Sequence, residues 1–125
     1  MSEKQLSYLR KIRKILARNE QYPLDAYSFM MAALDHTVKK LPEKRHVTGQ
    51  ELLEGIRQYT LDQFGPLSRT VLSHWSIRST LDFGHIVFAL VEAGILRKQP
   101  EDKLEDFANG YDFKKAFDAG YKIEP

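Results

Sequence analysis

Hydrophobic residues recur at three- and four-residue steps along most of the chain, which is the spacing of amphipathic helices. The first run predicts a helix over 6–18 with one apolar arc and one basic arc. Pro23 ends this helix, because proline lacks an amide donor and disfavours helical backbone in the residue before it. The next run is apolar on most sides and predicts a central helix over 24–38.

Local start and stop signals divide the middle of the chain. Thr48 followed by Glu51 has the pattern of a capping box, which predicts a helix over about 49–63. Gly65 and Pro66 then end that helix and start the next one, because glycine favours helix ends and proline favours first turns.

Two further helices are expected after this turn. The first spans 67–75, and its predicted inward residues are Leu67, Val71, Leu72 and Trp75. Ser79 and Asp82 repeat the capping pattern and predict a helix over 80–93. Gly94 is the expected left-handed residue at its end.

The segment 95–107 predicts two short extended pieces around Pro100, and therefore a small two-stranded hairpin. A short helix after Pro100 is the alternative. With the hairpin, the order of elements over 48–107 is winged-helix-like. The exposed face of the helix 80–93 argues against reading of DNA bases, because it offers Asp82, His85, Ala89 and Glu92.

The tail 108–125 is rich in aromatic residues for a terminal segment, and we expect it to dock on the body of the protein. A short helix over 112–118, ended by Gly120, is predicted within it. The expected fold is mainly α: a single domain over 1–125 with five or six helices and a helical core over 22–94.

Charge is distributed unevenly along the 125 residues. The net charge is +2, yet residues 1–18 carry +5 and the remainder carries −3. A second basic run lies near Pro42. The candidate partner-binding residues are Arg10, Lys11, Lys14 and Arg18 of the first helix and Lys39, Lys40, Lys44 and Arg45 of the loop. Such surfaces suit phosphate groups or an acidic partner.

Composition excludes several chemistries. The chain has no cysteine, so thiol catalysis, disulfides and cysteine-ligated metals are absent. Its four histidines lie ten or more residues apart, and neither a zinc-binding nor a nucleotide-binding motif occurs. We therefore predict no catalytic residue, no metal and no cofactor. An enzyme site assembled through space from His36, His74 and His85 with an aspartate is the weaker alternative.

The sequence also bears on location. No apolar run approaches the ~20 residues that cross a bilayer, and the N-terminus lacks a signal-peptide core. The apolar arc of the first helix holds no tryptophan or phenylalanine, which argues against membrane-surface binding. The expectation is a cytoplasmic protein without a membrane partner.

Three segments together resemble a known group of sequences. They are His46–Phe107, with TGQELLEGIR, the FGP turn and TLDFGHIVFALVEAG, and the runs YPLDAYSFMMAAL at 22–34 and YDFKKAF at 111–117. This pattern is similar to a Verruc/Plancto-restricted family of small bacterial hypothetical proteins. The family has no assigned activity, so the resemblance transfers no functional residue and implies only a compact bacterial cytosolic protein.

These observations favour a non-catalytic adaptor that contacts a protein or ribonucleoprotein partner through the basic helix 6–18 and the loop 39–45. Sequence-independent binding of RNA or DNA by the same basic face is the alternative. A homodimer that exchanges the first helix between protomers also stays open.

Overall fold

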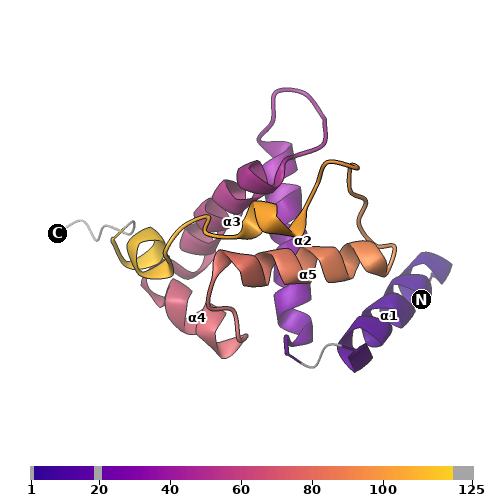
Figure 1. The fold of residues 1–125 in the computed structure, drawn as a ribbon. Helices are drawn as coiled ribbons and strands as arrows, with labels where there is room; N and C mark the ends of the chain where they lie inside the picture. Colours follow the sequence, from indigo (N-terminus) through magenta and orange to yellow (C-terminus); the bar gives the residue numbers. More distant parts are fainter. Residues whose placement is uncertain (1, 19–20, 120–125) are drawn as a thin grey trace.

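The computed structural model describes residues 2–18 and 21–119, and all of their regular structure is helical. The α-helices are α1 (Glu3–Arg18), α2 (Leu24–Lys39), α3 (Gly49–Phe64), α4 (Ser68–His74) and α5 (Thr80–Glu92). Two 3-10 turns, η1 (Gly65–Leu67) and η2 (Leu104–Phe107), and a π-helical segment η3 (Lys114–Ala119) complete the fold (Figure 1). The prediction of a mainly α fold is confirmed.

Helices α2 and α3 form the centre of the molecule and run in opposite directions along each other (Figure 1). Tyr27, Met30 and Ala33 of α2 are almost wholly buried, as is Ile56 of α3. Burial on several sides is what the apolar pattern of α2 predicts, because a helix that is hydrophobic all round needs neighbours all round.

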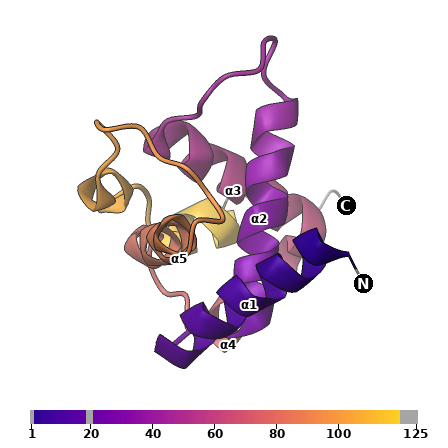
Figure 2. The same ribbon diagram turned by 90° about the vertical axis from the view of Figure 1, so that its right-hand side faces the viewer.

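Helix α5 runs across α2 and is seen end-on in Figure 2. Its residues Phe83, Ile86 and Leu90 are fully buried. Asp82 ties its start to the start of α2, because its Oδ1 accepts a hydrogen bond of 2.5 Å from the Tyr22 hydroxyl. Its Oδ2 accepts the backbone amide of Ser79 at 3.2 Å, which is the predicted cap.

The other predicted helix signals also have the expected geometry. The Thr48 hydroxyl accepts the Glu51 amide at 3.1 Å, and the Glu51 carboxylate accepts the Thr48 amide at 3.0 Å. Gly94 follows α5 with φ +77°, the left-handed conformation expected of it. Short-range hydrogen bonding therefore sets these helix ends, which is why local sequence predicted them.

The predicted hairpin over 95–107 is wrong, because the described residues contain no strand. The amides of Ile95 and Leu96 both turn back to the Leu90 carbonyl, at 2.9 and 3.2 Å. The second half of the segment coils into η2 and places Phe107 in the core, 4% exposed. Burial of this ring against α5 replaces the cross-strand pairing that a hairpin requires.

The winged-helix-like arrangement over 48–107 is wrong for the same reason, since the described residues provide no wing. The helix that would read DNA is instead covered by neighbours. Gly84 lies so close to η2 that a methyl group built on it would stand 2.8 Å from the Phe107 ring. Packing, rather than exposure, therefore dominates α5.

One residue between α3 and α4 differs from the sequence pattern. Leu67, predicted to point inward, is 60% exposed because it ends the 3-10 turn η1 before α4 begins. In the tail, Phe117 is 1% exposed and its ring packs edge-on against Phe113 at 5.1 Å. Gly120 and Tyr121 lie outside the described residues.

Candidate functional site

Helix α1 lies along one edge of the molecule (Figures 1 and 2). Most of the side chains of its basic face are exposed. Its apolar arc buries only Ile12 and Ile15. The cations Arg10, Arg13, Lys14 and Arg18 are exposed. No ion pair found between described residues involves a side chain of α1. The positive charge of this face is therefore not neutralised by the described part of the chain.

Lys11 differs from the other cations of α1. It is half-buried, and a methyl group built on Gly94 would lie 3.8 Å from its ammonium nitrogen. This places the ammonium beside the C-terminal end of α5, where a cation is favoured by the carbonyl groups that the helix leaves exposed. Lys11 thus serves packing within the fold more than binding at the surface.

The first two turns of α1 also expose apolar side chains. Leu6 and Leu9 are 40% and 37% exposed, and Leu9 lines a shallow groove with Lys4, Gln5 and Tyr8. The helical periodicity predicts Leu9 on the inward arc, whereas Leu6 falls between that arc and the basic face. Leu9 remains accessible because the buried contacts of α1 lie further along the helix, at Ile12 and Ile15.

The structure does not bring the two predicted basic segments together. The basic face belongs to α1, which packs beside α5, whereas residues 39–45 follow the far end of α2 (Figures 1 and 2). The two segments predicted from the sequence to bind one partner therefore form two separate surfaces.

Most cations of the second segment already have partners. Lys39 forms an ion pair with Asp35 at 2.8 Å, and the Lys40 ammonium donates to the Gln58 amide oxygen at 3.1 Å. Arg45 pairs with Glu51 at 2.6 Å. Hydrogen bonds from Arg45 and the Thr48 amide lower the pKa of Glu51 to about 2. Lys44 alone among the four predicted cations has neither an ion pair nor a side-chain hydrogen bond found between described residues, since Lys40 bonds to a neutral amide.

A cavity of about 340 Å³ lies beside this second segment. Its walls are apolar and come from elements far apart in sequence: Leu34 and Val38 of α2, Leu52 of α3, Val87 and Val91 of α5, and Phe107 of η2. Lys44, Arg45, Arg97 and Lys98 line it with exposed basic groups. Sequence reasoning missed this site, because its walls are assembled only by the packing of α5 and η2.

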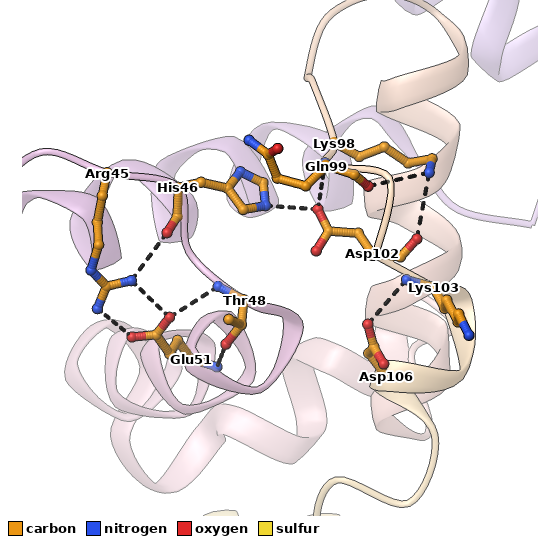
Figure 3. A network of polar contacts seen from close by, with 9 residues as sticks. All are labelled: Arg45, His46, Thr48, Glu51, Lys98, Gln99, Asp102, Lys103 and Asp106. Carbon is orange, nitrogen blue, oxygen red and sulfur yellow. Dashed lines mark hydrogen bonds and ion pairs between the residues drawn. The ribbon is translucent and has the colours of Figure 1, made fainter.

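Polar contacts hold the two segments that border the cavity (Figure 3). His46 Nε2 and Asp102 Oδ2 lie 2.7 Å apart and join the segment before α3 to the segment after α5. Asp102 Oδ2 also accepts the Gln99 amide at 2.7 Å, and Asp106 Oδ2 accepts the Lys103 amide at 3.0 Å. Both carboxylates are thus engaged within the protein, while Lys98 reaches only backbone carbonyls.

The histidines do not assemble a metal centre in the described residues, where no group of three or more histidine, aspartate or glutamate side chains could hold an ion. His36 packs against the Tyr59 ring at 5.0 Å between centroids, and His46 is paired with Asp102. His74 ends α4, and His85 is exposed on α5.

Within the described residues, no helix is both long enough and apolar enough to cross a membrane. Comparison of the chain with protein-family models, with curated proteins and with solved structures gave no match. The resemblance to the Verruc/Plancto-restricted family stays a prediction.

Proposed function

We propose that this protein is a non-catalytic adaptor that binds an acidic segment of a protein or ribonucleoprotein partner along α1. The observation that carries the proposal is the exposed face of Arg10, Arg13, Lys14 and Arg18, which forms no ion pair found between described residues. Unneutralised charge of one sign attracts an oppositely charged partner and speeds its association.

The exposed leucines favour a protein partner over bare nucleic acid. Leu6 and Leu9 lie on the same helix as the basic face, and Leu9 borders a shallow groove. An amphipathic acidic helix could cover both the leucines and the cations, whereas a phosphate backbone offers charge but little apolar surface. Sequence-independent RNA or DNA binding by Arg10, Lys14 and Arg18 is the alternative function.

A photo-crosslinking residue at Leu9 tests the proposal in extract of the source cell. Charge reversal at Arg10→Glu and Lys14→Glu should abolish the crosslink to a defined protein. The matched control is Lys114→Glu with Lys115→Glu, which changes the net charge equally at two exposed positions of the tail. Because all four residues are exposed, each variant should melt within a few degrees of the unaltered protein.

The outcomes separate the two functions. Loss of the protein crosslink in the α1 variant alone, with nuclease having no effect, supports the adaptor. The nucleic-acid function is supported instead if the crosslinks vanish with nuclease and the protein binds a homopolymer RNA with an affinity that falls steeply with salt. Equal crosslinking in both variants, or no specific crosslink at Leu9, overturns the proposal.

A further inference from the structure

We propose that the cavity bounded by α2, α3, α5 and η2 binds a small amphipathic anion: a hydrocarbon chain that ends in a carboxylate. This site is separate from the basic face of α1 and shares no residue with it. The inference rests on three features of the cavity, which are its apolar walls, its pre-formed shape and the sign of the charge at its border.

The walls suit a hydrocarbon chain. Leu34, Val38, Leu52, Val87 and Val91 face the cavity from three helices. A volume of about 340 Å³ lies at the lower end of the range of roughly 300–1,000 Å³ that is typical of small-molecule sites. Transfer of a hydrocarbon chain from water to such walls is favourable in proportion to the apolar area covered.

The wall formed by η2 is held in place by contacts outside the cavity. The Thr80 hydroxyl donates to the Phe107 carbonyl at 2.6 Å, and it accepts the Gly110 amide at 3.0 Å. The Phe107 ring rests against Gly84, where a larger residue would collide with it. A pre-formed wall lowers the entropic cost of binding, because little needs to be ordered when the ligand enters.

The border selects an anion. Lys44, Arg97 and Lys98 border the cavity and form no ion pair found between described residues. The two acidic groups there are already engaged, Asp102 by His46 and the Gln99 amide and Asp106 by the Lys103 amide. Four cations and two carboxylates line the cavity, so its border keeps a net positive charge even when Arg45 is counted as paired with Glu51, and a carboxylate head group is favoured there.

The border also favours a small molecule over a protein segment. The contact of 2.7 Å between His46 and Asp102 joins the two segments that border the cavity (Figure 3). This contact limits how far the segments can separate. A single hydrocarbon chain needs a narrower opening than a helix, which is about 10 Å wide with its side chains, so this contact favours the smaller ligand.

Titration of isotope-labelled protein with decanoate, followed by amide NMR, tests the site. Saturable one-to-one binding should shift the amides of Val47, Val91 and Leu96, which border the cavity, and leave those of α1 unchanged. Decanol and decyltrimethylammonium carry the same chain with a neutral and a cationic head. Both should bind at least about tenfold more weakly if the border selects an anion.

Two variants separate the head-group and chain contributions. Arg97→Glu with Lys98→Glu reverses the charge at two exposed positions and should weaken the binding of decanoate by about tenfold or more. Val91→Trp fills part of the cavity without changing its charge and should reduce binding of all three probes. Lys114→Glu with Lys115→Glu is the matched control, because it changes the net charge equally at exposed positions outside the cavity, and it should bind decanoate like the unaltered protein.

Several results would overturn the inference. These are no saturable binding of decanoate, equal binding of the cationic probe, or unchanged affinity in the Arg97 and Lys98 variant. Should Val91→Trp fail to fold, the variant at the exposed border still decides the question. A negative result here leaves the adaptor proposal intact, because the α1 crosslinks depend on other residues.

Discussion

Thr37 of α2 lies against Gly55 of α3 where the two central helices pack together. A methyl group built on Gly55 would stand 1.9 Å from the Thr37 hydroxyl oxygen and 2.8 Å from its Cβ. The hydroxyl donates to the Ala33 carbonyl at 2.8 Å and is buried, so it cannot simply rotate into solvent. The spacing of α2 and α3 therefore depends on the absence of a side chain at position 55.

Gly55→Ala should destabilise the protein by about 1–3 kcal/mol, the usual cost of forcing extra atoms into a packed core. Chemical denaturation measures the change in the free energy of unfolding. Adding Thr37→Ala should recover only part of the loss, because the Cβ at 2.8 Å remains. A fully stable Gly55→Ala single variant would contradict the close approach.

Thr80→Val tests how the chain after α5 is held. The variant loses the hydroxyl that donates to the Phe107 carbonyl and accepts the Gly110 amide. It should lower the free energy of unfolding by about 1–3 kcal/mol, because the buried Phe107 carbonyl and the partly buried Gly110 amide lose their partner. Hydrogen exchange should quicken at Gly110. Thr80→Ser keeps the hydroxyl and should retain most of the protection.

Tyr22→Phe tests the link between the starts of α2 and α5. It removes the hydroxyl that donates to Asp82 at 2.5 Å, and a loss of about 1–3 kcal/mol is expected for a hydrogen bond to a carboxylate. The cap of α5 should survive, since Asp82 Oδ2 still accepts the Ser79 amide. Asp82→Ala should cost more than Tyr22→Phe, because it also removes the acceptor of the Arg78 and Ser79 amides.

The stability of the protein at alkaline pH offers a second test of the contact between Tyr22 and Asp82. Burial, together with the hydrogen bond to Asp82, raises the pKa of Tyr22 above its ordinary value of 10.0. Because the pKa is higher in the folded state, the neutral phenol contributes its full share to the free energy of unfolding below pH 10. That contribution decreases as the pH rises above 10. The stability deficit of Tyr22→Phe should therefore shrink above pH 10. A deficit that stays constant would contradict the shift.

Glu51→Gln tests the ion pair with Arg45. The glutamine retains an oxygen that can accept the Thr48 amide, so the variant removes charge while keeping the cap. The pKa of Glu51 is lowered from 4.5 to about 2 in the folded protein. The ionised carboxylate therefore contributes its full stabilisation above pH 4.5, and this stabilisation disappears as the pH falls through about 2.

The melting temperature of Glu51→Gln should consequently be lower than that of the unaltered protein at pH 7. The difference should narrow between pH 5 and 2, where the unfolded and then the folded carboxyl becomes protonated. Parallel thermal melts of the two proteins measure this difference in melting temperature. The comparison isolates Glu51, because the other carboxylates titrate equally in both proteins. A gap that is independent of pH would exclude the ion pair as its source.

Several parts of this fold follow from neighbouring residues in the sequence. The Thr48–Glu51 and Ser79–Asp82 patterns predict helix starts, and Gly94 predicts a helix end. Each depends on hydrogen bonds or backbone conformation within about one turn. The same holds for the basic face of α1, since helical spacing alone puts Arg10, Lys14 and Arg18 on one side.

Other parts were decided only by contacts between distant elements. The pattern of 95–107 favoured a hairpin, with a short helix after Pro100 as the alternative, whereas the structure forms the 3-10 turn η2 and buries Phe107 against Gly84. Likewise, no local rule leaves Leu9 accessible on the apolar arc, or separates α1 from residues 39–45.

By itself, the sequence determined the helical periods, their ends and the concentration of charge in the first helix, because these depend on residues within a few positions of each other. Only the tertiary structure decided which of those charges remain unpaired and where the cavity lies. Its walls come from Leu34, Leu52, Val91 and Phe107, which lie 18, 39 and 16 positions apart along the chain. The sequence lists such residues, but only the packing of α2, α3, α5 and η2 makes them neighbours.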